Sequence, residues 1–167
     1  MMYLGLGSNI GDREGYLARA VELLGMHVFT SMHISDIYTS PALLKQDSPE
    51  EWDIPFLNMV VGGTTLLSAE EVLHKIKEIE SILGKQKRGT WAPREIDIDL
   101  VCYYETIINT PDLTLPHTGI EHRDFVLLPL QQIAPNWKHA VNKQTVSQLI
   151  DQLTITTSQP WLHALAS

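Results

Sequence analysis

Two aspartates near the middle of the chain, Asp97 and Asp99, have the spacing of side chains on one face of a β-strand. Side chains of a strand alternate between its faces, so this pair and Glu95 point one way and Ile98 the other. Carboxylate oxygens suit Mg²⁺, which usually binds together with substrate phosphates. An isolated D-x-D is more often a half-exposed strand, but Asp is disfavoured in strands and here follows a basic loop. The pair therefore predicts a metal platform for phosphoryl chemistry.

Cations that could bind phosphates come just before the two aspartates. Arg94 lies between a proline and the strand, and its guanidinium can bind a phosphate through two parallel hydrogen bonds. Glycines at both ends would let the preceding loop close over a triphosphate. The loop supplies Lys85, Lys87, Arg88 and Trp91. Taken alone, this is a solvated surface loop; beside the aspartates, it predicts a phosphate-binding lid.

Ring and amide side chains elsewhere suit a flat heterocycle. Phe56 and Asn58 begin one predicted strand, and an amide offers the donors and acceptor that a pterin or purine edge requires. Downstream, His117 and Arg123 could contact phosphates, and Phe125 could stack on a ring. Each has a structural alternative: a loop histidine, a surface arginine or a core phenylalanine. Their joint presence favours one shared site.

Composition limits the possible functions. The formal net charge of −8 over 167 residues argues against a nucleic-acid surface, which needs an excess of Lys and Arg. Six of the twelve basic residues fall between positions 75 and 94, a local patch that suits a small polyanion such as a nucleotide. The histidines lack zinc-enzyme spacing. A dinucleotide fingerprint starting at Gly5 fails at Ile10, so Gly5, Gly7 and Gly11 are predicted to let the chain turn tightly at the end of the first strand, with Asn9 near the substrate.

The hydrophobic pattern predicts an α+β fold with a ferredoxin-like βαββαβ core. An antiparallel sheet would carry both helices on one face and leave the other open for a site. Asp12 and Ser68 are predicted to cap these helices, and Gly84 to end the second. Extra C-terminal helices are expected over 125–133 and 146–153. The strands are expected over 3–6, 34–38 and 56–65 and at Asp97–Asp99, with a long polar lid over 41–55.

The remaining expectations concern the whole protein. The chain is expected to form one domain, residues 1–167, and to act as a monomer. No run of 18 apolar residues or charged leader is present, so we expect a soluble cytoplasmic protein without a membrane partner. Cys102, the single cysteine, is placed by strand parity on the apolar side of the Asp97/Asp99 strand, as an inert buried thiol.

Taken together, these motifs resemble those of the 6-hydroxymethyl-7,8-dihydropterin pyrophosphokinases of folate biosynthesis. The similarity covers almost the whole chain, and the order and spacing of its motifs make it specific. Its central element is Pro93-Arg94-Glu95-Ile96-Asp97-Ile98-Asp99. The other motifs are Gly7-Ser8-Asn9, Tyr38-Thr39-Ser40-Pro41, Phe56-Leu57-Asn58, Pro116-His117, Arg123-Asp124-Phe125 and Leu128-Pro129-Leu130.

The resemblance implies transfer of pyrophosphate from ATP to the hydroxymethyl group of the dihydropterin, with release of AMP. It implies that Asp97 and Asp99 hold two Mg²⁺ ions and that Arg94 joins them in catalysis. The implied ATP-binding residues are Lys85, Lys87, Arg88, Trp91, Arg94, His117 and Arg123. The implied pterin-binding residues are Ser40, Pro41, Leu43, Phe56, Asn58 and Phe125.

The chain also departs from the family's pattern. Arginines are commoner than Lys85 and Lys87, a basic residue is usual at Thr90 and glycine at Ala92, and the 41–55 loop is longer than in compact members. Lysine lacks the guanidinium fork, so the loop would close more weakly unless Arg88 replaces the missing contact. Two alternatives stay open: another metal-nucleotide transferase with D-x-D, or a non-enzymatic ferredoxin-like ligand-binding domain.

Overall fold

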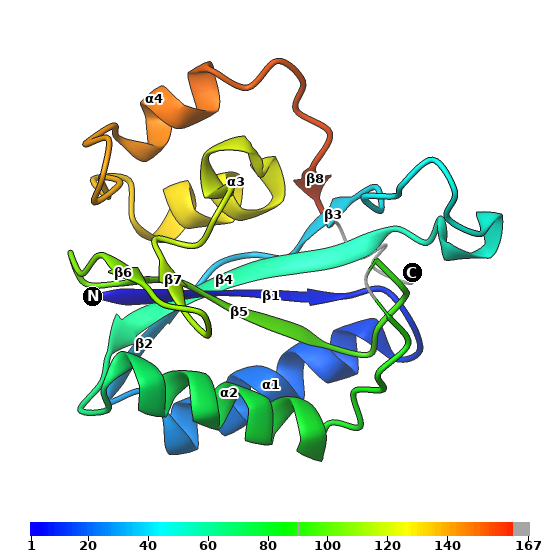
Figure 1. Cartoon of the computed structure of the whole chain (residues 1–167), viewed down its shortest axis with the longest axis horizontal. Coiled ribbons are helices and arrows are strands. Elements are labelled where there is room, and N and C mark those ends of the chain that lie inside the picture. Colours follow the sequence, from blue (N-terminus) through cyan, green and yellow to red (C-terminus); the bar gives the residue numbers. More distant parts are fainter. Residues whose placement is uncertain (90, 162–167) are drawn as a thin grey trace, which may run out of the picture.

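A six-stranded sheet with helices on both faces forms the protein, as seen in the computed structural model of residues 1–89 and 91–161 (Figure 1). Thr90, one of the departures above, lies outside the described residues. The strands are β1 (Met2–Ser8), β2 (Ser31–Ile34), β3 (Tyr38–Ser40), β4 (Phe56–Thr64), β5 (Asp97–Tyr103), β6 (Ile108–Asn109), β7 (Thr114–Leu115) and β8 (Gln159–Pro160). The α-helices are α1 (Arg13–His27), α2 (Ala69–Ile82), α3 (Asp124–Ile133) and α4 (Val146–Asp151), and the 3₁₀ helices are η1 (Glu50–Trp52) and η2 (Ile120–His122).

The order of the strands confirms the ferredoxin-like core. Along the main sheet the order is β5-β1-β4-β3-β8, and β2 also pairs with β4. The central strand β1 is antiparallel to both β4 and β5. Helix α1 follows β1 and helix α2 follows β4, and both lie on the same face of the sheet (Figure 1). This is the predicted βαββαβ arrangement.

The strand predicted over 34–38 is wrong in its position. Two short strands, β2 and β3, replace it, and each pairs with a different part of β4. Between them, the hydroxyl of Ser35 accepts a hydrogen bond from the backbone N–H of Val60 at 2.9 Å. A serine side chain can replace a backbone acceptor in this way and interrupt the regular ladder. The interruption leaves β3 as a separate short strand between β4 and β8.

Helices α1 and α2 begin where the sequence predicts, and α2 also ends there. The Asp12 side chain accepts the N–H of Gly15, and Ser68 and Glu71 form a reciprocal capping box. Gly84 follows α2 with a φ of +82°, a conformation that favours glycine at a helix end. Both helices bury apolar residues, including Leu17 of α1, against the sheet. No helix in the described part of the chain is long and apolar enough to cross a membrane.

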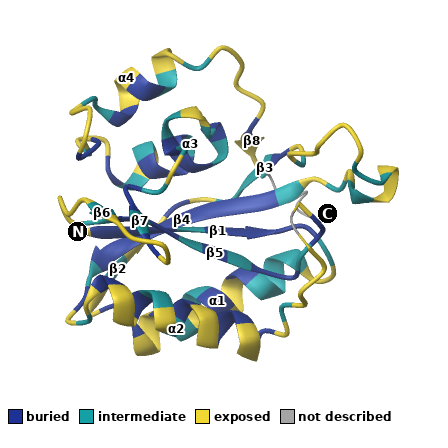
Figure 2. Ribbon diagram, viewed as in Figure 1, coloured by how far each residue is buried: buried dark blue, intermediate teal, exposed yellow. Residues whose placement is uncertain are grey.

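Helices α3 and α4 lie on the opposite face of the sheet, which is therefore partly covered (Figures 1 and 2). They pack on Tyr3, Val60 and Val101 in a second apolar cluster. Cys102 belongs to this cluster, so its predicted side of the strand is wrong. An irregularity in the β1–β5 register, between Tyr3 and Leu4, breaks the strict alternation on which that prediction depended. The thiol is nevertheless buried, and burial raises its pKa to about 11, as expected for an inert cysteine.

Candidate active site

Gly5 and Gly7 lie opposite the two aspartates. In the antiparallel β1–β5 pair, Gly5 faces Asp99 and Gly7 faces Asp97. A Cβ added at Gly7 would lie 3.1 Å from Oδ1 of Asn58. Gly11, with a φ of +71°, lies in the bend after the first strand as predicted, whereas Gly5 and Gly7 lie inside β1, which continues through Ser8. Their lack of side chains instead leaves space above the middle of the sheet.

A cavity of about 260 Å³ occupies this space, on the part of the face that α3 leaves uncovered. The structure brings most of the predicted site residues together around it. Of the predicted ATP and metal residues, those that line it are Trp91, Arg94, Asp97, Asp99, His117 and Arg123. All the predicted pterin residues line it: Ser40, Pro41, Leu43, Phe56, Asn58 and Phe125. Lys85, Lys87 and Arg88 are not among the lining residues.

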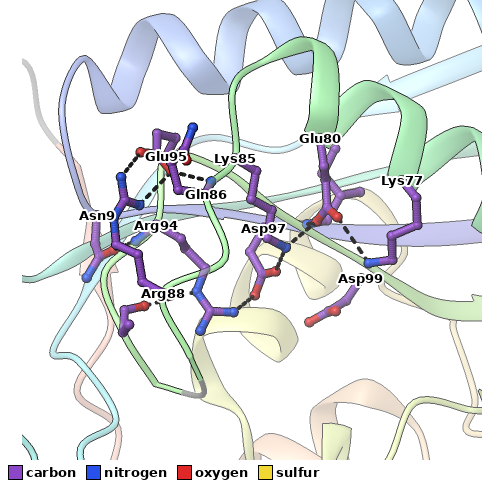
Figure 3. A network of polar contacts seen from close by, with 12 residues as sticks. Asn9, Lys77, Glu80, Lys85, Gln86, Arg88, Arg94, Glu95, Asp97 and Asp99 are labelled. Carbon is purple, nitrogen blue, oxygen red and sulfur yellow. Dashed lines mark hydrogen bonds and ion pairs between the residues drawn. The ribbon is translucent and has the colours of Figure 1, made fainter.

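Both carboxylate oxygens of Asp97 are bound by cations (Figure 3). Lys85 Nζ lies 2.6 Å from Oδ1, and the Arg94 guanidinium lies 2.8 Å from Oδ2. Burial favours the protonated carboxyl, but these two cations outweigh it and hold the pKa of Asp97 below its usual value. Asp97 is therefore a carboxylate at neutral pH, and its cationic partners are groups that a triphosphate would also attract.

Asp99 has weaker partners. His117 Nε2 lies 3.9 Å and the Arg123 guanidinium 4.0 Å from its Oδ2. Burial, and then the negative charge of Asp97, raise the pKa of Asp99 above its usual value, although His117 and Arg123 oppose the shift. A cation that binds between two carboxylates relieves their repulsion and stabilises both negative charges. The pair thus has the charge and the oxygen donors that Mg²⁺ prefers.

Glu95, which strand parity groups with the aspartates, precedes β5 and is not among the residues that line the cavity with them. Its carboxylate pairs instead with the guanidinium of Arg88 through both oxygens, and it accepts the backbone N–H of Gln86 at 3.2 Å (Figure 3). Hydrogen bonding to Arg88 lowers the pKa of Glu95 from 4.5 to about 2. In this structure the pair anchors the 84–91 loop to the start of β5.

The Glu95–Arg88 pair predicts a pH dependence of stability. Because folding lowers the pKa of Glu95, its contribution is complete above pH 4.5 and is lost as the pH falls toward 2. Arg88 is 36% exposed, and solvent screening reduces the contribution to about 1 kcal/mol. Urea unfolding of the wild type and of Glu95→Gln measures it: the difference in unfolding free energy should shrink between pH 5.5 and 3. A constant difference would contradict the prediction.

Glu80 of α2 is a buried acid that the sequence analysis did not identify as part of the site. Its side chain is 5% exposed, and it accepts the backbone N–H of Ile98 at 2.8 Å. It also binds Lys85 Nζ at 2.7 Å and Lys77 Nζ at 3.0 Å (Figure 3). Lys85 thus bridges Glu80 to Asp97. A signal was present: Glu80 is four residues after Ile76, on the apolar stripe of α2.

We expect Glu80→Gln to lower the free energy of unfolding by about 1–3 kcal/mol, because a buried charged acceptor loses its ionic partners. Glu78→Gln is the matched control: Glu78 is in the same helix and pairs with Lys75, but its side chain is 44% exposed. A pair this exposed contributes little to stability, because solvent screens its charges. Chemical denaturation of both variants measures the two effects, and equal losses would show that the Glu80 network is no more than a surface contact.

Asn9 positions Arg94 and is not itself among the residues that line the cavity. Its Oδ1 accepts the backbone N–H of Arg94 at 2.8 Å, and its own N–H donates to the Arg94 carbonyl at 3.2 Å. Its Nδ2 donates to the carbonyl of Ile54 at 3.1 Å. Asn9 therefore fixes Arg94 relative to the end of the 41–55 loop.

The other side of the cavity has few charges. Asn58 donates from Nδ2 to the hydroxyl of Ser40 at 2.9 Å, which fixes its amide, and Phe56 lies at the start of the same strand. From α3, Phe125 faces the cavity beneath the guanidinium of Arg123, 5.9 Å from the ring centre. Two rings and an oriented amide thus lie beside the cations and carboxylates, so the cavity joins a phosphate-binding half to a half suited to a flat heterocycle.

Comparison with known proteins agrees with this geometry. Residues 3–135 match the model of the 7,8-dihydro-6-hydroxymethylpterin-pyrophosphokinase family. The chain belongs to this family. An Aquifex aeolicus relative named 2-amino-4-hydroxy-6-hydroxymethyldihydropteridine pyrophosphokinase is 38% identical over 154 residues, 92% of each chain. A Bacillus subtilis relative of the same name is 38% identical over 151 residues, 90% of this chain and 85% of the relative.

Membership of the family also agrees with the fold. A solved Plasmodium falciparum HPPK-DHPS, a structure with pterin and p-hydroxybenzoate, matches with a TM-score of 0.70 at 16% identity. It covers 95% of this chain, which spans 46% of that one. The chain likewise spans 30% of a Chlamydia muridarum folate synthesis bifunctional protein that is 37% identical to it. The family thus occurs both as separate chains and within longer ones.

Proposed function

We propose that the protein transfers the pyrophosphoryl group of ATP to the hydroxymethyl oxygen of 6-hydroxymethyl-7,8-dihydropterin, in folate biosynthesis, with release of AMP. The observation that carries this proposal is the position of Asp97 and Asp99. They lie in one cavity, between the cations of one half and the rings and amide of the other. Family membership supplies the reaction, and the cavity supplies a place for both substrates.

The donor set fits Mg²⁺. Within residues 1–89 and 91–161, no group of three or more His, Cys, Asp or Glu is arranged to enclose a metal. Mg²⁺ is commonly bound by one or two carboxylates together with substrate phosphates, which is what Asp97 and Asp99 offer. We propose two Mg²⁺ ions, bound with ATP. When bound, they would neutralise phosphate charge and lower the pKa of the attacking hydroxyl.

The side chains have complementary tasks. Arg94 would bind the triphosphate, oriented by Asn9, while His117 and Arg123 would bind it from the other side of Asp99. Lys85, Lys87, Arg88 and Trp91 would join them when the 84–91 loop closes, and Lys85 and Arg88 would then exchange Asp97 and Glu95 for phosphate. Closure excludes water and strengthens each of these charge contacts.

The pterin would lie between Phe56 and Phe125, with Asn58 binding its edge and Ser40, Pro41 and Leu43 completing the pocket. Its hydroxyl oxygen then forms a bond to the β-phosphorus of ATP as the bond from that phosphorus to the α,β-bridging oxygen breaks. AMP leaves with the electron pair, and the hydroxyl proton passes to water. Phosphoryl transfer of this kind depends on positioning and charge stabilisation more than on a strong base.

A single incubation tests the proposal. With Mg²⁺, ATP and the hydroxymethyl-dihydropterin, we expect AMP and the pterin diphosphate in equal amounts. ADP in place of AMP would indicate a different phosphoryl transfer. Turnover of a nucleotide-sugar would support the D-x-D transferase alternative. Pterin binding without turnover would support a ligand-binding domain.

We propose that the enzyme acts as a monomer. The single cysteine is a buried free thiol, which suits the reducing cytoplasm. Analytical ultracentrifugation, with and without substrates, tests the first of these proposals.

A further inference from the structure

We propose that the C-terminal strap, Thr157–Trp161, is a positioning element that holds the pterin side of the cavity in shape. The proposal extends the function above and depends on it, because it assigns the pterin to the half of the cavity formed by β3, β4 and α3. The strap lies outside residues 3–135, the part of the chain that matches the family model. Three separate anchors connect it to three walls of the cavity.

The first anchor is Asp124, the first residue of α3. Its Oδ2 accepts the backbone N–H of Thr157 at 2.6 Å, the Thr157 hydroxyl at 3.2 Å and the N–H of Ser158 at 2.8 Å. Asp124 is buried, and its neighbours in sequence are Arg123 and Phe125, both of which line the cavity. Three hydrogen bonds to one buried carboxylate fix the start of α3 relative to the strap.

The second anchor is the edge of the sheet. Strand β8 of the strap pairs antiparallel with β3, and the N–H of Trp161 donates to the carbonyl of Ile37 at 2.8 Å. Strand β3 has only three residues and ends at Ser40, whose hydroxyl orients Asn58. Without β8, this short strand would be held on one side only, and short edge strands are weakly fixed.

The third anchor is the Trp161 side chain, which reaches the start of α1. Its indole N–H donates to Glu14 at 2.6 Å, and the guanidinium of Arg13 lies over its ring at 5.6 Å. Arg13 in turn donates to the carbonyl of Pro55 at 2.9 Å, directly before the cavity residue Phe56. The strap is thereby connected to the end of the 41–55 loop as well.

The anchor formed by β8 and β3 lies at the edge of the sheet opposite β5, the strand of the two aspartates. Of the cavity residues assigned to ATP, only Arg123 is a sequence neighbour of an anchor. Loss of the strap should therefore weaken pterin binding far more than ATP binding. If the strap only holds the walls of the pterin side in place, its loss should lower the affinity for pterin about tenfold, because the walls must then be ordered when pterin binds.

Chains of different length test this inference. A chain that stops after Thr156 lacks the strap, and a matched chain that stops after Trp161 keeps all its anchors. Calorimetric titration with Mg²⁺ and a non-hydrolysable ATP analogue, followed by pterin, measures both affinities. For the chain without the strap we expect Kd for pterin to rise about tenfold or more, and Kd for the nucleotide to change by less than about threefold.

A point variant makes the test independent of truncation. Trp161→Ala removes the third anchor alone and should raise Kd for pterin about threefold to tenfold, whereas Trp161→Phe keeps a ring beside Arg13 and should recover part of the loss. If the truncated chain fails to fold, as judged by circular dichroism, the variants Trp161→Ala and Trp161→Phe decide the question. The criteria stay the same: Kd for pterin should rise and Kd for the nucleotide should not.

The outcomes separate this inference from the proposed function. If the full chain and the chain ending at Trp161 both fail to bind pterin, the proposed function fails. If both bind it and strap loss leaves Kd for pterin within twofold, the strap inference is overturned. Equal loss of pterin and nucleotide affinity would also overturn it, because that result indicates a general loss of structure.

Discussion

Asp97→Asn should lower kcat by at least about 10³-fold with the fold retained. The substitution preserves shape but removes a charge that would hold metal against the phosphates, and such metal contacts contribute several kcal/mol to the transition state, about tenfold for each 1.4 kcal/mol. In the free protein Lys85 and Arg94 contact different oxygens of Asp97. Asparagine keeps one acceptor oxygen for one of these cations, and its NH₂ group cannot accept from the other. The quantities to measure are kcat from AMP release and the thermal midpoint.

Two further variants sharpen this test. Asp99→Asn should behave similarly, because Asp99 shares the cavity with Asp97. Asp151→Asn is a matched control on α4, where the side chain is exposed and lies outside the cavity lining, and it should keep normal turnover. A direct readout is the Mg²⁺ dependence of nucleotide binding, which Asp97→Asn should weaken. AMP release by Asp97→Asn within tenfold of the wild type would remove this carboxylate from the mechanism.

The fold was predictable to the extent that it depends on local patterns. Alternation and helical periodicity located β1, β4 and both long helices, and the caps at Asp12 and Ser68 fixed where those helices begin. The errors arose where a single interaction changes a regular pattern. The hydroxyl of Ser35 divides one expected strand into two, and a register irregularity moves Cys102 to the other face. Neither the Ser35 hydrogen bond nor the register irregularity can be deduced from neighbouring residues in the sequence.

The content of the site was predictable, but its internal pairing was not. Asp97, Arg94 and the rings were recognisable because their types and order are unusual. Which cation pairs with which acid depends on how α2, the 84–91 loop and β5 meet in space. Lys85 binds Asp97 and Glu80, and Arg88 binds Glu95, so these two cations lie outside the cavity lining in the structure. The lid role of the 84–91 loop stays a prediction, because it concerns a state with ATP bound.

Arg94→Ala should reduce kcat/KM by about 30- to 1000-fold, a loss of about 2–4 kcal/mol, as expected when a preorganised donor to developing charge is deleted. Arg94 is well preorganised. The backbone N–H and carbonyl of Arg94 are both hydrogen-bonded to Asn9. The Arg94 guanidinium donates to Asp97 and to the carbonyl of Ala92. Lys85 differs from Arg94 in that its loop is predicted to move when it closes over ATP.

Single-turnover measurements with saturating ATP and pterin test whether the loss belongs to the chemical step. Arg94→Lys is the informative companion, because it keeps the charge but gives up the planar fork, and it should recover only part of the rate. Asn9→Ala should reproduce part of the Arg94→Ala defect, since it frees the Arg94 backbone while leaving the guanidinium in place. A normal single-turnover rate in Arg94→Ala would mean that this cation stabilises the free protein, through Asp97, and contributes nothing to the transition state.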